Sequence, residues 1–244
     1  MPNVLELCDN YKAQDEGFPA DDPMTVEMDF ERARFNMVEQ QIRTWEVLDP
    51  RVLELLFRVR REDYVPEAYR ALAFADMEIP LGHGEKMLAP RLEARLLQEL
   101  EIQTSDRILE VGTGSGYMTA LLARLGGHVY SVEIVPELSS RAAERLRRDA
   151  VSNVTLDVGD GARGWDRHGP YDAIVLTGSV PLLPESFLKS LNPGGRLIAV
   201  VGEPPVMEAQ LVSCVTTGVY NTVGLFETCI PPLRNAARPN KFVF

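Results

Sequence analysis

Three glycines at alternate positions stand in a segment whose residue types suit the binding of a small ligand. Gly112, Gly114 and Gly116 follow an apolar run of strand length and precede a segment with helical spacing. Because glycine has no Cβ atom, these positions allow a tight turn and a close approach of the backbone to a ligand. A dinucleotide fingerprint needs a glycine where Tyr117 stands, and the Lys-Ser/Thr pair of a P-loop is missing.

The pattern that starts at Glu110, Glu-x-Gly-x-Gly-x-Gly, is that of methyltransferases that use S-adenosylmethionine. Glu133 stands at the end of the next expected strand, where a carboxylate can accept both hydroxyls of a ribose. Asp160 lies between two glycines after the third strand, where it can accept from an adenine amino group. A ligand-free turn and solvated acids are the ordinary alternatives. The predicted cofactor site comprises Glu110, Gly112, Thr113, Gly114, Gly116, Glu133, Ile134, Asp160, Gly161 and Thr177.

The elements that must position these residues alternate between strand and helix. Apolar runs predict strands at 107–111, 128–132, 154–158, 173–176 and 196–201, and helical spacing predicts helices at 115–124, 137–149 and 184–191. This alternation predicts a doubly wound α/β sheet that is mostly parallel and covered on both faces. The β-branched segment 210–226 predicts an antiparallel pair that closes the sheet, and 231–244 is expected to be mostly loop.

Helical spacing also precedes the sheet. It runs from Phe30 to Trp45, and a second helix is expected after Asp49 as N-cap and Pro50 as first residue. The segment 79–90 contains Pro80 and two glycines and is expected to be a loop, after which a third helix runs from 90 to 100, with Pro90 as its first residue.

The chain of 244 residues carries a net charge of −11, and that charge is unevenly spread. Residues 1–29 hold eight acids and one base, a net of −7, which leaves −4 for the remaining 215 residues. Residues 1–29 are therefore expected to form an acidic flexible tail. Residues 30–244 are expected to form a single methyltransferase domain, with N-terminal helices and a substrate loop over 30–104 and the cofactor-binding sheet over 105–244.

Composition excludes several classes of protein. No apolar run is long enough to span a bilayer, and residues 1–10 lack the features of a secretory signal. The acidic balance, without a basic cluster near the expected groove, argues against a nucleic-acid partner. Three scattered cysteines favour a reducing, cytoplasmic setting, and neither they nor the three histidines have the spacing of a metal site.

From about Met37 to Val201 the sequence resembles protein-L-isoaspartate O-methyltransferases. The stretches that carry the resemblance are 59–66, 80–84, 110–117, 130–133, 159–165 and 170–174. The resemblance implies a seven-stranded Rossmann-like methyltransferase sheet with extra N-terminal helices that help to cover the substrate groove. It also implies S-adenosylmethionine as cofactor and methyl esterification of isoaspartyl carboxylates in damaged proteins.

The segment after His83 and Gly84 departs from that family. Family members usually carry Gln-Thr-Ile-Ser there, whereas this chain has Glu-Lys-Met-Leu, so Leu88 occupies the position of the serine hydroxyl. Leu88 cannot donate a hydrogen bond, and the loss of one positioning donor costs about 1–3 kcal/mol. As a hypothesis, the Lys86 ammonium compensates by attracting the carboxylate; the alternative is a solvated loop lysine. The predicted substrate loop comprises His83, Gly84, Lys86, Met87 and Leu88.

Two other functions stay open because of Leu88. One is a methyltransferase of the same fold that acts on another carboxylate or on a hydroxyl, in a protein, a peptide or a small molecule. The other is a catalytically impaired cofactor-binding protein that serves as an interaction module through its acidic tail. A nicotinamide oxidoreductase is disfavoured by the glycine spacing. The sequence leaves the oligomeric state open.

Overall fold

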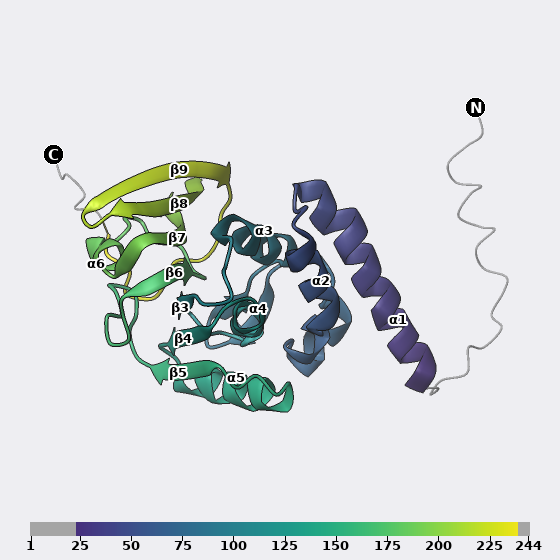
Figure 1. The fold of residues 1–244 in the computed structure, drawn as a ribbon. Coiled ribbons are helices and arrows are strands. Elements are labelled where there is room, and N and C mark those ends of the chain that lie inside the picture. Colours follow the sequence, from purple (N-terminus) through teal and green to yellow (C-terminus); the bar gives the residue numbers. More distant parts are fainter. Residues whose placement is uncertain (1–22, 239–244) are drawn as a thin grey trace.

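A twisted seven-stranded sheet organises the chain, with strand order β5-β4-β3-β6-β7-β8-β9 (Figure 1). The computed structural model describes the backbone of residues 23–238 and the side chains of residues 30–238. Strands β3 to β7 are parallel, whereas β8 and β9 are antiparallel to their neighbours. The strands are β3 Arg107–Val111, β4 His128–Glu133, β5 Val154–Val158, β6 Tyr171–Leu176, β7 Leu191–Glu203, β8 Val206–Thr216 and β9 Val219–Glu227.

Helices cover both faces of this sheet. Successive residues of a strand point to opposite faces, and in β3 Ile108 packs into a larger core with Leu121 of α4, whereas Leu109 packs into a second core with Phe187 of α6. Figure 1 accordingly has α4 and α6 on opposite sides of the strands. The predicted doubly wound sheet is therefore confirmed. The helices are α3 Pro90–Leu100, α4 Tyr117–Leu125, α5 Pro136–Arg148 and α6 Glu185–Lys189.

The strands of the sheet agree with the sequence prediction better than the N-terminal helices and the hairpin do. Strands β3 and β5 have the predicted bounds, and the antiparallel pair expected within 210–226 is β8 and β9. Strand β7 extends beyond the predicted 196–201 at both ends. At its start Leu191 pairs with Tyr171 of β6 across a register shift, and at its end Gly202 and Glu203 pair with β8.

The first N-terminal helix begins earlier than predicted, and its hydrogen-bond pattern changes along its length. Helix α1, Pro23–Asn36, begins before the expected boundary at residue 30, while residues 1–22 of the predicted tail lie outside the described residues. It continues into a π-helical turn, Met37–Ile42, and then a 3-10 turn, Arg43–Trp45, so residues 30–45 are helical as predicted but change their hydrogen-bond pattern at Met37 and again at Arg43. Helix α2, Pro50–Arg58, begins as predicted, since the Asp49 carboxylate accepts from the backbone N–H of Arg51. Two further 3-10 helices are Arg61–Asp63 and Glu67–Leu72.

The predicted loop over residues 79–90 is instead a small hairpin. Strands β1, Ile79–Gly82, and β2, Glu85–Met87, pair antiparallel through Ile79 and Met87. Its proline and glycines suggested a loop, but two edge strands this short tolerate them because few ladder hydrogen bonds are lost. His83 lies at the turn with a φ of 56°, in the left-handed region. Among the described residues, no helix combines the length and apolar character that crossing a bilayer requires.

Candidate active site

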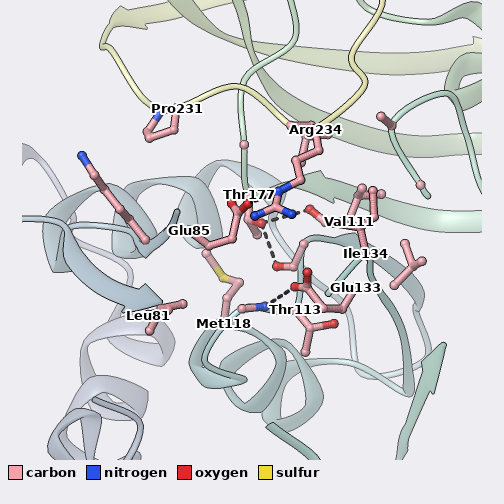
Figure 2. A pocket seen from close by; sticks show the side chains of 18 of the residues that line it. Leu81, Glu85, Val111, Thr113, Met118, Glu133, Ile134, Thr177, Pro231 and Arg234 are labelled. Atoms are coloured by element: carbon pink, nitrogen blue, oxygen red, sulfur yellow. Dashed lines mark hydrogen bonds and ion pairs between the residues drawn. The ribbon is translucent and has the colours of Figure 1, made fainter. Parts of the chain in front are cut away.

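A pocket opens at the carboxyl ends of β3, β4, β5 and β6. Because the chain runs from β3 outward to β5 and then returns to β6 on the other side, β3 lies at the topological switch point where open α/β sheets bind ligands. The β1–β2 hairpin and the segment 231–234 complete the wall (Figure 2). The sequence-predicted residues that line this pocket are Lys86, Met87, Leu88, Gly112, Thr113, Gly114, Glu133, Ile134, Asp160, Gly161 and Thr177.

Glu133 connects the glycine turn to the helix that follows β4. Its Oε2 accepts from the backbone N–H of Gly114 at 2.8 Å, and its Oε1 accepts from the backbone N–H of Val135 at 3.0 Å. The side chain is buried at the pocket wall (Figure 2). A carboxylate has about four acceptor positions, so each oxygen of Glu133 can still accept a hydroxyl from a ligand while it holds the turn in place.

Glu110 lies beneath the glycine turn and is not among the residues that line the pocket. Its Oε2 accepts from the hydroxyls of Thr119, at 2.5 Å, and Ser131, at 2.6 Å. Since Ser131 donates its proton to Glu110, Thr113 is the donor in the 2.6 Å contact between Thr113 and Ser131. Burial raises the pKa of Glu110 to about 8, and the two hydroxyl donors oppose that rise. Glu110 therefore supports the turn from below through Thr113.

Gly112 and Thr177 meet where β3 and β6 end. A Cβ atom on Gly112 would lie 2.2 Å from Thr177 Oγ1, and Gly112 has a φ of 98°, so no larger residue fits there. The Thr177 hydroxyl donates to the backbone carbonyls of Val111, at 2.9 Å, and Gly112, at 2.7 Å. The hydroxyl thus fixes the start of the turn. Its hydrogen bonds go to the backbone, and the Thr177 side chain therefore shapes the pocket through the turn.

Gly116 has a packing role at the start of α4. It is the N-cap residue, with a φ of 85°, and a Cβ there would lie 3.1 Å from the Cβ of Ala142 in α5. It is absent from the pocket lining. The third glycine of the motif therefore lets two helices approach each other, while the first two shape the pocket wall.

Asp160 follows β5 and is held by two hydrogen bonds. Its Oδ1 accepts from the backbone N–H of Ala162 at 3.1 Å, and its Oδ2 accepts from the side-chain amide of Asn235 at 3.0 Å. Asp160 and Gly161 both line the pocket. An adenine amino group is a donor of the same kind as the Asn235 amide, so the carboxylate suits the predicted partner.

On the substrate side, a buried ion pair holds the backbone of Leu88. Arg61 pairs with Glu93 and donates to the carbonyl oxygen of Leu88 at 2.6 Å and to that of Ala73 at 2.9 Å. Glu93 lines the pocket, and burial raises its pKa to about 7 against the opposing effect of Arg61. The Leu88 side chain is buried, so the position of the family's serine is apolar here but its backbone is firmly placed.

The other predicted loop residues have different surroundings. Lys86 is exposed, and its ammonium pairs with Glu78 at 2.7 Å. A strong hydrogen bond with Glu78 raises the pKa of Lys86, which therefore stays charged at neutral pH. His83 and Gly84 are exposed and are not among the pocket-lining residues. Instead, the His83 carbonyl accepts from the guanidinium of Arg234.

Sequence reasoning missed the residues that the hairpin, α4 and the C-terminal segment bring to the pocket. Leu81 and Met118 contribute apolar surface, and Arg234 contributes a cation (Figure 2). The C-terminal segment was expected to be mostly loop, and none of its residues was among the predicted site residues. Its dense run, Pro231-Pro232-Leu233-Arg234, was the available signal, because two prolines followed by an apolar and a charged residue favour a rigid extended segment.

The pocket suits S-adenosylmethionine better than a metal ion. Following the order of the neighbouring strands β3, β4 and β5, it offers the glycine turn and two acceptor groups, the carboxylates of Glu133 and Asp160. The Glu133 carboxylate can accept from the hydroxyls of a ribose, and the Asp160 carboxylate can accept from the amino group of an adenine. In the described part of the chain, no group of three potential ligand side chains could hold a metal ion.

Comparison with known proteins identifies the family. A sequence model described as "Protein-L-isoaspartate(D-aspartate) O-methyltransferase (PCMT)" matches residues 32–219. A protein-L-isoaspartate O-methyltransferase of Methanoculleus marisnigri is 41% identical over 203 residues, which cover 83% of this chain and 91% of that protein. The Myxococcus xanthus protein of the same name is 47% identical over 156 residues, which cover 64% of this chain and 74% of that one.

Solved structures agree on the fold. A protein-L-isoaspartate O-methyltransferase matches with a TM-score of 0.71 at 24% identity, over 82% of this chain and 65% of that chain. A Plasmodium falciparum protein described as a protein-L-isoaspartate O-methyltransferase, in complex with S-adenosyl-L-homocysteine, matches with a TM-score of 0.70 at 22% identity, over 84% and 98%. With the sequence matches, these establish that the chain belongs to the protein-L-isoaspartate(D-aspartate) O-methyltransferase family.

Proposed function

We propose that this protein transfers a methyl group from S-adenosylmethionine to isoaspartyl carboxylates in damaged proteins or peptides. The observation that carries the proposal is the pocket at the switch point, where the Gly114 N–H and the Glu133 carboxylate are joined at 2.8 Å and Asp160 lines the same pocket. Glu133 and Asp160 would hold the ribose and the adenine, and the Gly112–Gly114 turn would approach the amino-acid part. Family membership supports the same cofactor and reaction.

The acceptor needs positioning more than activation. When bound, S-adenosylmethionine supplies a methyl group on a sulfonium sulfur, and a carboxylate is already a charged nucleophile at neutral pH, so no proton has to be removed. Orientation of the acceptor is then the main contribution that the chain makes. The residue after β2 is Leu88, with its backbone held by Arg61, and the C-terminal segment supplies Arg234. Leu88 makes the wall apolar where the family usually has a hydroxyl.

The proposal extends to the setting of the enzyme. The substrate would be a protein or peptide segment that reaches the pocket between the hairpin and the C-terminal segment. A reducing, cytoplasmic location is supported by the cysteines, of which Cys214 is buried and Cys229 exposed, both as free thiols. Residues 30–244 would act as one domain, since helix α2 and the sheet share one core.

A panel of acceptors tests the proposal. Purified protein is given labelled S-adenosylmethionine with an isoaspartyl peptide, the matching aspartyl peptide and a small carboxylic acid, and incorporated methyl is measured. Labelling of the isoaspartyl peptide alone supports the proposal. Labelling of the small acid alone would favour a different acceptor. Binding of S-adenosylhomocysteine with no labelling would favour an impaired cofactor-binding protein. A thermal shift with S-adenosylhomocysteine, compared with NAD, reports the cofactor class separately.

A further inference from the structure

The C-terminal segment from Ile230 to Asn235, here called the strap, is tied across the carboxyl ends of the strands. The backbone N–H of Ser179 donates to the carbonyl of Pro231 at 2.9 Å, and the backbone N–H of Leu233 donates to the carbonyl of Ser179 at 2.9 Å. The Ser179 hydroxyl also donates to the Ile230 carbonyl at 3.0 Å. Ser179 follows β6 closely, so these three bonds fix the strap over the pocket.

Two consecutive side chains of the strap reach opposite walls of the pocket. Arg234 Nε lies 2.5 Å from Oε1 of Glu85 in β2, and its Nη2 donates to the His83 carbonyl. Asn235 donates to Asp160 on the cofactor side at 3.0 Å. Figure 2 shows the Arg234 guanidinium reaching down from the strap toward Glu85 and Thr177. Arg234 is therefore placed between the hairpin and the end of β6, at the mouth of the pocket.

Two cations occur among the residues that line the pocket, Lys86 and Arg234. Burial along β2 alternates, with Glu85 half-buried, Lys86 exposed and Met87 buried, so the Lys86 side chain points away from the face that carries the other two. There it pairs with Glu78. Arg234 approaches from the strap and meets Glu85 on the pocket side. Of the two, Arg234 is thus the cation that faces an acceptor.

We propose that Arg234 binds the carboxylate of the methyl acceptor and that Glu85 occupies the same guanidinium when no acceptor is present. This inference rests on the proposed function. An arginine guanidinium presents five N–H donors in a planar fork that matches a carboxylate. The Glu85 carboxylate already uses part of that fork, so it stands where the acceptor's carboxylate would stand. Arg234, rather than Lys86 as hypothesised from the sequence, would then attract the carboxylate of the acceptor.

The exchange has a consequence for product release. An isoaspartyl residue carries one free carboxylate, and esterification removes its negative charge. The neutral ester is a weaker partner for a guanidinium than a carboxylate is, so Glu85 regains Arg234 after the reaction. Glu85 therefore competes with the carboxylate of the acceptor for Arg234, whereas the neutral ester makes little use of the guanidinium and does not need to displace Glu85.

Peptide binding to the protein saturated with S-adenosylhomocysteine tests the inference without turnover. Fluorescence anisotropy measures the dissociation constant of a labelled isoaspartyl peptide and of its methyl ester, and calorimetry measures that of S-adenosylhomocysteine. The variants are Arg234→Gln and Glu85→Gln. Arg58→Gln is the matched control, because Arg58 also forms a 2.5 Å pair with a glutamate, Glu54, but on the exposed face of α2 and outside the pocket.

Arg234→Gln is expected to weaken isoaspartyl-peptide binding about tenfold or more, the usual effect of a lost charge-assisted hydrogen bond. Glu85→Gln is expected to strengthen binding about threefold, because a competitor for Arg234 is removed. Methyl-ester binding and S-adenosylhomocysteine binding are expected to stay within about twofold in both variants. Arg58→Gln is expected to change none of the three constants.

Three kinds of result would overturn the inference. One is unchanged isoaspartyl-peptide binding in Arg234→Gln. Another is equal weakening by Arg234→Gln and Glu85→Gln, or equal loss for peptide and ester, since a purely structural clasp gives that pattern. The third is a loss confined to S-adenosylhomocysteine, which would assign Arg234 to the cofactor's own carboxylate. Failure of the proposed function is separate: the unaltered protein would then neither bind nor methylate the isoaspartyl peptide.

Discussion

The backbone N–H of Gly114 donates a hydrogen bond of 2.8 Å to the carboxylate of Glu133. The two residues come from the turn after β3 and the end of β4, which are neighbouring parallel strands. One carboxylate thereby orders the glycine turn and faces the pocket at the same time (Figure 2). The turn and the ribose acceptor of the proposed site are consequently one unit rather than two independent contacts.

Glu133→Gln tests this unit. The amide of Gln offers one acceptor oxygen, so its NH₂ group would face the N–H of either Gly114 or Val135. We expect the affinity for S-adenosylhomocysteine to fall about tenfold or more, with a loss of stability of about 1–3 kcal/mol. Calorimetry and denaturant unfolding measure the two effects. Glu137→Gln, on the exposed side of α5, is the control. Unchanged affinity in Glu133→Gln would remove Glu133 from the cofactor site.

The raised pKa of Glu110 implies that the stability of the protein depends on pH. Burial raises the pKa of Glu110 from 4.5 to about 8. Between these values the folded protein binds more protons than the unfolded chain, so the free energy of unfolding falls as the pH rises. The contribution is complete below the unfolded value and is lost as the pH passes the folded one. Glu110→Gln does not titrate, and its amide oxygen can still accept from Thr119 and Ser131.

We therefore expect the fall in unfolding free energy between about pH 5 and about pH 8 to be smaller in Glu110→Gln by about 1–3 kcal/mol. Denaturant unfolding at a series of pH values measures this. Parallel curves for the variant and the unaltered protein would mean that Glu110 is ionised across the whole range.

Leu88→Ser restores the hydroxyl that the family usually has. Because Arg61 holds the Leu88 carbonyl, the backbone is expected to stay in place. We expect kcat/KM for an isoaspartyl peptide to rise about tenfold, the effect of one positioning hydrogen bond, and stability to fall by about 2–4 kcal/mol through the lost apolar contacts. Leu88→Ala creates a similar cavity without the hydroxyl and is the control. Equal kcat/KM in both variants would argue that this chain positions its acceptor by other groups.

The buried pair of Arg61 and Glu93 is expected to behave as a unit. Arg61→Met leaves the Glu93 carboxylate buried without its cation and frees the Leu88 carbonyl, so we expect a loss of about 3–5 kcal/mol in unfolding free energy. Adding Glu93→Leu removes the stranded charge and is expected to recover part of the loss. A double-mutant cycle in denaturant measures the coupling. Additive losses would show that the two side chains do not depend on each other.

The sheet could be predicted because each strand is locally encoded. Arg107–Val111 and Val154–Val158 are apolar runs bounded by turn residues, and their bounds agree with the structure. The hairpin at residues 79–87 could not, since Pro80 and two glycines lower strand propensity and only pairing across the turn stabilises it. The strand propensity of single residues does not include the stabilisation that comes from pairing with another strand.

Within the site, residue types were easier to predict than partners. Glu133 and Asp160 reach the pocket because strand ends meet at one edge of a parallel sheet. The burial of Glu110 under the turn and the bonds of Thr177 to backbone carbonyls depend on packing between strands, which no local pattern records. Arg234 meets Glu85 from 149 residues away, so only the folded chain brings them together.

The most direct test of the account is the ratio of two methylation rates. The kcat/KM for an isoaspartyl peptide is compared with that for the same peptide with a normal aspartyl residue, and tandem mass spectrometry locates the methyl group. The account predicts esterification at the isoaspartyl carboxylate and a rate for the aspartyl peptide lower by about a hundredfold or more, because the pocket is expected to place only the former carboxylate at the reacting position. Equal rates for the two peptides, or a methyl group elsewhere on the peptide, would contradict it.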